Sequence, residues 1–126
     1  MNYIDNSTNF DILYVLGDTH GENMKIAPHL IGDDKSLSKC ILHCGDFGIG
    51  FSSVKGDVAM MERLNTRLKK YNTTMYVVRG NHDDPKWFNS SGTVTEEHQF
   101  PNVILVPDHT ILNLTIQDES KVVYMN

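Results

Sequence analysis

Three short blocks of the sequence place possible metal ligands beside glycines: Gly17-Asp18-Thr19-His20-Gly21, Gly45-Asp46-Phe47-Gly48 and Gly80-Asn81-His82-Asp83. Asp18 and His20 are two residues apart, so in extended backbone both side chains leave on one side and could hold one cation. The Asp46 carboxylate could bridge two cations, and Asn81 adds a neutral oxygen ligand. This set of donors suits Mn²⁺, iron or Zn²⁺, and it suits a centre with two metals.

Two-metal centres are well matched to phosphoryl displacement. Their metals lie about 3.5–4 Å apart and clamp the attacking and leaving oxygens, and they lower the pKa of bound water toward about 7. His82, next to Asn81, could donate a proton to the departing oxygen as a general acid. Either Asp83 or Asp84 could orient His82, and the sequence leaves that choice open.

The blocks follow three apolar runs with strand-forming residues, at positions 12–16, 40–44 and 74–78. Helical spacing predicts a helix over 22–31, interrupted by a proline, and a second helix from a cap at Asp57 to about Tyr71. Alternation of strands and helices predicts a parallel sheet with right-handed crossovers. Ligands bind at the carboxyl ends of such strands, where all three blocks lie, so we expect one composite site.

The remainder of the chain has a different pattern. Trp87 and Phe88 are expected to pack inward after a turn, and short strands are expected over 103–106, 110–116 and 122–125. Residues 1–9 read as a polar N-terminal segment without the pattern of a secretory signal. We therefore expect residues 1–126 to form a single domain.

Composition narrows the class of protein. A chain of 126 residues suits one domain, and a formal net charge of -5 gives no electrostatic footprint for nucleic-acid phosphates, so long nucleic acid is not an expected partner. No apolar run approaches the length of a membrane span. Cys40 and Cys44 would be too far apart on one strand for a disulfide, so we expect buried free thiols and a cytoplasmic location.

Together the three blocks resemble the calcineurin-like metallophosphoesterase family from about Ile12 to Trp87, and more closely its small bacterial and phage members. The segment 45–50 lacks the arginine that serine/threonine protein phosphatases carry after this aspartate. The resemblance implies an α/β fold, an α/β/β/α two-sheet sandwich. It also implies a dinuclear centre of Mn²⁺, Fe²⁺/³⁺ or Zn²⁺ that hydrolyses phosphomonoesters or phosphodiesters with a metal-bound hydroxide.

The same resemblance assigns roles to individual residues. Asp18 and His20 would hold the first metal, Asp46 would bridge, and Asn81 would bind the second metal. His82 would assist the leaving group or the phosphoryl oxygens. Apart from the resemblance, we expect Asp83, the neighbour of His82, to be a catalytic residue as well.

One departure from the family concerns its later Gly-His and Gly-His-x-His motifs, which do not occur up to Asn126. His98 and His109 follow no glycine, although either could substitute for a missing ligand. We therefore expect a C-terminally truncated domain with an incomplete second sheet and an incomplete second metal site. The alternatives are a degenerate member that binds metal weakly and is inactive alone, or one half of a split protein. Besides a phosphoester substrate, the expected partners are a second copy or a complementing C-terminal fragment, because an open sheet edge would be exposed.

Overall fold

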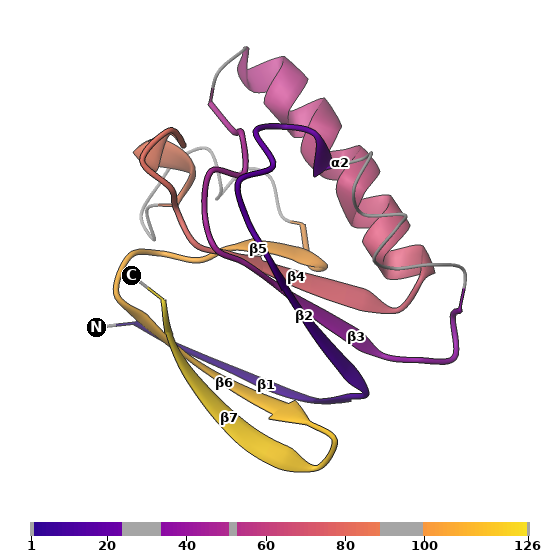
Figure 1. The fold of residues 1–126 in the computed structure, drawn as a ribbon. Helices are drawn as coiled ribbons and strands as arrows, with labels where there is room; N and C mark the ends of the chain where they lie inside the picture. The colour runs from indigo at the N-terminus through magenta and orange to yellow at the C-terminus, as the bar shows by residue number, and fades with distance from the viewer. Residues whose placement is uncertain (1, 24–33, 51–52, 89–99, 126) are drawn as a thin grey trace.

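The computed structural model describes residues 2–23, 34–50, 53–88 and 100–125, which form two β-sheets and one α-helix (Figure 1). The first sheet is parallel throughout, with the strand order β2-β3-β4-β5. Its strands are β2 (Ile12–Leu16), β3 (Lys39–His43), β4 (Thr73–Val77) and β5 (Val103–Leu105). The three expected strands and their parallel arrangement are confirmed, with boundaries within one residue of the prediction.

Helix α2 (Val54–Lys70) crosses from β3 to β4 and packs on β4 and β5. The expected cap at Asp57 is wrong. Ser53 is the N-cap, because its side chain accepts a hydrogen bond from the Gly56 amide, 3.1 Å away. Asp57 lies in the first turn, where its negative charge interacts favourably with the helix dipole. The helix expected over 22–31 falls almost wholly outside the described residues.

The second sheet has the order β1-β6-β7 and contains an element that the sequence did not predict. Strand β1 (Asn2–Phe10) pairs in parallel with β6 (Thr110–Ile116), and β6 pairs in antiparallel fashion with β7 (Glu119–Met125). The polar segment 1–9 therefore contributes a strand from residue 2 onward. Its polar composition concealed the strand, because only Ile4 and Phe10 join the apolar cluster between the sheets.

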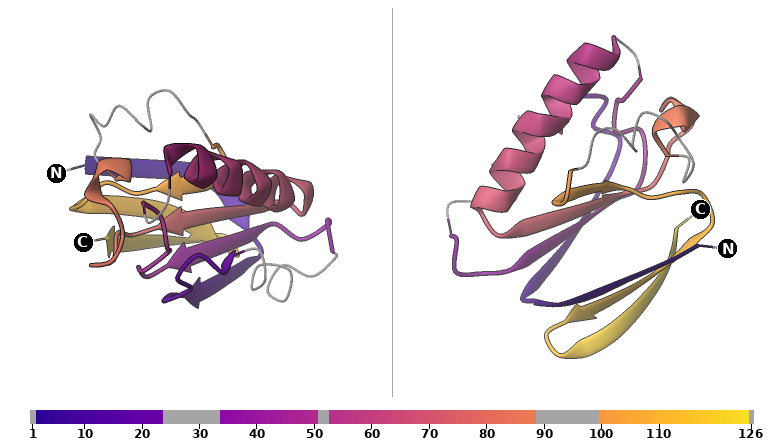
Figure 2. Two further views of the ribbon diagram at one scale, coloured as in Figure 1. Left: turned by 90° about the horizontal axis from the view of Figure 1, so that it is seen from above. Right: turned by 180° about the vertical axis from the view of Figure 1, so that it is seen from behind.

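The layers are α2, the parallel sheet and then the second sheet (Figures 1 and 2), which gives three layers of the expected four within the described part of the chain. Adjacent residues of β3 serve opposite faces, as the two-residue repeat of a strand requires. Ile41 belongs to the cluster beneath α2, whereas Cys40 and Leu42 belong to the cluster between the sheets. The expected inward packing of Trp87 and Phe88 is confirmed, since each is 2% exposed.

The two cysteines are free, as expected, but they differ in environment. Cys40 is buried, and burial raises the pKa of its thiol to about 12. Cys44 is exposed, contrary to expectation, because β3 ends at His43 and Cys44 already lies in the following loop. Among the described helices, none has the length and apolar character that a bilayer crossing requires.

Candidate metal centre

All three blocks lie at one edge of the parallel sheet, as the order of elements predicts. Leu16 of β2 is in register with His43 of β3, and His43 is in register with Val77 of β4. The three strands therefore end together, and the chain leaves each of them toward the same region (Figure 1).

Backbone hydrogen bonds continue the pairing of β2 and β3 into the first two blocks. The amide of Asp18 donates to the Gly45 carbonyl at 2.8 Å, and the amide of His20 donates to the Asp46 carbonyl at 2.9 Å. Asp18, His20 and Asp46 have positive φ angles of 62°, 48° and 53°. Left-handed backbone is unfavourable for residues other than glycine and concentrates at functional sites, so these bonds hold a strained arrangement in place.

Two glycines are required by close approach of the loops. A Cβ at position 48 would lie 2.0 Å from the Gly21 amide nitrogen, and a Cβ at position 80 would lie 2.1 Å from the Asp46 amide nitrogen. Neither contact leaves room for a side chain, because both neighbours are backbone atoms. The first block is thus pressed against the second, and the second against the third.

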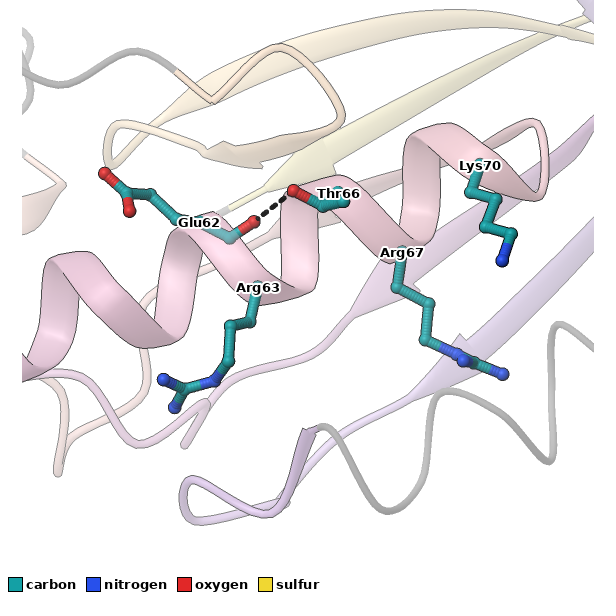
Figure 3. A pocket seen from close by; sticks show the side chains of 5 residues that line it. All are labelled: Glu62, Arg63, Thr66, Arg67 and Lys70. Atoms are coloured by element: carbon teal, nitrogen blue, oxygen red, sulfur yellow. Dashed lines mark hydrogen bonds between the residues drawn. The ribbon is translucent and has the colours of Figure 1, made fainter.

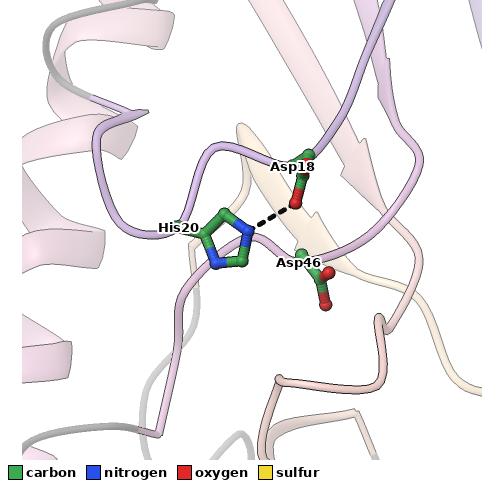
Figure 4. Close-up of side chains that lie close together, drawn as sticks. All are labelled: Asp18, His20 and Asp46. Atoms are coloured by element: carbon green, nitrogen blue, oxygen red, sulfur yellow. Dashed lines mark ion pairs between the residues drawn. The ribbon is translucent and has the colours of Figure 1, made fainter.

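The side chains of Asp18, His20 and Asp46 converge (Figure 4), each offering a ligand atom within 4.8 Å of the other two. His20 Nε2 contacts Asp18 Oδ1 directly. The Asp18 and His20 side chains are 76% and 51% exposed, so a solute can reach them from solvent. Two carboxylates and an imidazole at this spacing could hold a divalent cation. The residues predicted as the first-metal pair and the bridging aspartate therefore lie together, and their roles as metal ligands stay predictions.

His82 lies at the border of this group. Its amide donates to Asp46 Oδ1 and its ring Nδ1 contacts Asp46 Oδ2, both at 3.1 Å. These bonds from His82, the amide bond first, lower the pKa of the Asp46 carboxyl group. The His82 ring centroid lies 5.7 Å from that of His20. Asn81 is exposed and directly follows Gly80, whose backbone lies against Asp46. The role of Asn81 as a ligand of the second metal stays a prediction.

The expectation that Asp83 or Asp84 orients His82 is wrong, because Asp46 contacts the His82 ring instead. Asp84 caps the short 3₁₀ helix η1 (Pro85–Trp87) by accepting from the Lys86 amide at 3.0 Å. Asp83 is only 3% exposed, and its carboxylate is occupied by backbone amides. Those donors are Phe47 at 3.1 Å, Gly48 at 2.8 Å, Ile49 at 3.3 Å and Gly80 at 3.0 Å.

A buried polar chain beneath the blocks was not predicted. The Gly45 amide donates to His43 Nδ1 at 3.2 Å, so Nε2 carries the proton that points at Thr19 Oγ1, 2.8 Å away. Thr19 in turn donates to Asn23 Oδ1 at 2.6 Å, and the Asn23 amide group donates to the Phe47 carbonyl at 2.9 Å. The sequence offered one hint, which was the position of a histidine in an otherwise apolar strand.

Burial lowers the pKa of His43 to about 4, against the opposing influence of the carboxylates of Asp83, Asp46 and Asp18. His43 is therefore neutral near pH 7. It serves as a fixed hydrogen-bonding element between the first and second blocks, rather than as a group that exchanges protons with solvent.

The other candidate residues lie elsewhere. His109 Nδ1 contacts the Tyr124 hydroxyl at 2.7 Å, and His109 is not part of the converging group within the described residues. His98 lies outside the described residues. Arg79 donates to both carboxylate oxygens of Asp108, at 2.9 and 3.3 Å.

A cavity of about 520 Å³, open to solvent, lies along α2 (Figure 3). The described residues that line it all belong to that helix: Glu62, Arg63, Thr66, Arg67 and Lys70. None of the predicted site residues is among them, so the candidate metal ligands occupy the open edge of the sheet instead of this cavity.

Comparison with known proteins gives a single result. No curated protein and no solved structure matches the chain significantly. The family model of the calcineurin-like phosphoesterase superfamily domain matches residues 12–125, a span that contains all three blocks and the residues converging at the sheet edge. The chain therefore belongs to the calcineurin-like phosphoesterase superfamily.

Proposed function

We propose that this protein is a metal-dependent phosphoesterase that hydrolyses phosphomonoesters or phosphodiesters at the edge of the parallel sheet. The observation that carries the proposal is the convergence of Asp18, His20 and Asp46 within 4.8 Å at the ends of β2 and β3. Membership of the phosphoesterase superfamily supports the reaction class.

In this proposal Asp18 and His20 hold one ion, Asp46 is shared, and Asn81 binds a second ion of Mn²⁺, iron or Zn²⁺. Bound divalent ions would supply Lewis-acid chemistry and lower the pKa of water at the site. The chain itself contributes a shared carboxylate that is kept ionised, because hydrogen bonds from His82 lower the pKa of Asp46.

His82 is the proposed general acid. Its Nδ1 contacts Asp46, which leaves Nε2 on the opposite side of the ring for a substrate oxygen. The side chain is 56% exposed, so a phosphoester arriving from solvent can reach it. Contact with Asp46 fixes the ring so that a proton on Nε2 can pass to the departing alkoxide.

The test is Mn²⁺-dependent hydrolysis of p-nitrophenyl phosphate and of its bis ester. Asp46→Asn should abolish most of the activity, because it removes the charge of the shared carboxylate. Glu119→Gln removes the same charge from an exposed position on β7 and should leave the rate unchanged. Equal rates for the wild type and Asp46→Asn would sink the proposal.

The alternative is a chain that binds a single ion weakly and hydrolyses little by itself. It is favoured by the size of the ligand group, which among the described Asp, Glu, His and Cys residues contains only Asp18, His20 and Asp46. Isothermal titration with Mn²⁺ separates the two possibilities. Two tight sites per chain would refute the alternative, whereas one weak site without hydrolysis would support it.

A further inference from the structure

We propose that Asp83 is a positioning residue whose carboxylate fixes the second block against the third and so sets the geometry of the metal ligands. This inference rests on the proposed function for its effect on activity. The hydrogen bonds of the Asp83 carboxylate do not depend on that function.

Each carboxylate oxygen of Asp83 accepts hydrogen bonds from two backbone amides. Oδ1 accepts from the amides of Gly48 at 2.8 Å and Ile49 at 3.3 Å. Oδ2 accepts from the amides of Phe47 at 3.1 Å and Gly80 at 3.0 Å. Three of these donors directly follow Asp46, and the fourth directly precedes Asn81, so one side chain ties together the two blocks whose ligands must meet.

The first block is held through the same segment. The Gly21 amide donates to the Phe47 carbonyl at 2.9 Å, and the backbone of Gly48 lies against that of Gly21. A shift of residues 47–49 would therefore also move the loop that carries Asp18 and His20. Asp83 thus contacts the second and third blocks directly and is linked to the first block through residues 47–49.

The geometry demands a carboxylate at this position. Each oxygen accepts from two N–H groups, whereas an amide side chain has one oxygen and one NH₂ group. In Asp83→Asn the NH₂ group would face two N–H donors, and at 3% exposure there is little room for water to replace the lost acceptor. The substitution is nearly isosteric, yet it should release one side of the connection.

Asp83 acts through other residues. It is buried, both of its oxygens are occupied by amides, and it is absent from the converging ligand group. Mutation of a group that holds metal ligands in place typically weakens metal affinity about 10–100-fold, and we expect a loss in this range when Asp83 is replaced.

The experiment compares Asp83→Asn with Asp84→Asn, which removes the same charge one residue later and keeps a side chain able to cap η1. Amide hydrogen exchange in the metal-free protein should be slow for residues 47–49 and 80 in the wild type and in Asp84→Asn. It should be at least about tenfold faster in Asp83→Asn, because one side of the buried acceptor is gone. Isothermal titration should show Mn²⁺ affinity falling about tenfold or more in Asp83→Asn and staying unchanged in Asp84→Asn.

If Asp83→Asn does not fold, Asp83→Glu tests the same geometry, because it keeps the charge and moves the oxygens by one methylene. Unchanged exchange, or faster exchange with unchanged Mn²⁺ affinity, would overturn the positioning role. Wild-type protein that binds Mn²⁺ without hydrolysing phosphoesters would overturn the proposed function. The positioning role of Asp83 would still be tested by the Mn²⁺ affinities of the wild type and Asp83→Asn. Wild-type protein that binds no Mn²⁺ would overturn both.

Discussion

The buried histidine of β3 makes the stability of the fold depend on pH. Burial lowers the pKa of His43 from 6.5 to about 4. Each pKa unit corresponds to about 1.36 kcal/mol, so the full effect on the free energy of unfolding is about 3 kcal/mol. Because the folded pKa lies below the unfolded one, the unfolded chain binds the proton more readily. The contribution of neutral His43 is thus fully present above pH 6.5 and is lost as pH falls from 6.5 toward 4.

The structural cause lies in what surrounds the ring. Nδ1 accepts from the Gly45 amide, so a proton added there would face another N–H. The opposing carboxylates of Asp83, Asp46 and Asp18 attract the proton but do not outweigh burial. At pH 5.5 linkage predicts a loss of about 1.4 kcal/mol relative to pH 7.5 from this group alone.

The assay is urea unfolding at pH 7.5 and 5.5 with a chelator present, so that metal binding does not contribute. His43→Gln keeps a donor and an acceptor but cannot titrate, and it should remove about 1.4 kcal/mol of the pH dependence. Identical pH dependence in the two proteins would refute the reasoning. So would an NMR titration that places the pKa of folded His43 near 6.5.

Three further predictions concern the loops and the outer sheet. In thermal melts, Gly48→Ala should destabilise the fold by several kcal/mol, because its Cβ would lie 2.0 Å from the Gly21 amide nitrogen. The control Gly56→Ala, in the first turn of α2, should be neutral or stabilising in the same melts. Thr19→Val should lower the free energy of unfolding by about 1–3 kcal/mol in urea titrations, because it leaves His43 and Asn23 without their shared hydroxyl; an unchanged value would show that the buried chain is not stabilising. In sedimentation runs the protein should self-associate more as its concentration rises, because the second sheet exposes Val122. Val122→Ser should weaken the self-association, and a wild-type monomer at high concentration would contradict the prediction.

The strands and the edge at which they end could be predicted because their signals are local. Apolar runs closed by Gly-Asp or Gly-Asn specify buried parallel strands, and the alternation with helices places the three blocks together. Residue type and spacing thus point to Asp18, His20 and Asp46, whose side chains lie together in the structure. Strand β1 could not be predicted in this way, because its pairing with β6 joins distant parts of the chain and its own residues are mostly polar.

The roles of Asp83 and His43 also depended on contacts that sequence does not reveal. Asp83 stands next to His82 in the chain, which suggested a catalytic pair, yet the backbone turns its carboxylate onto residues 47–49. His43 lies in an apolar strand, and only the structure shows that Thr19 accepts from its ring. In both cases the partner lies more than twenty residues away in the sequence.

Anomalous diffraction from crystals grown with Mn²⁺ tests most directly whether the three blocks build a metal centre. If they do, a peak should lie within coordinating distance of Asp18, His20 and Asp46 together. Well-ordered side chains at these positions with no peak between them, or a peak bound elsewhere on the chain, would contradict it.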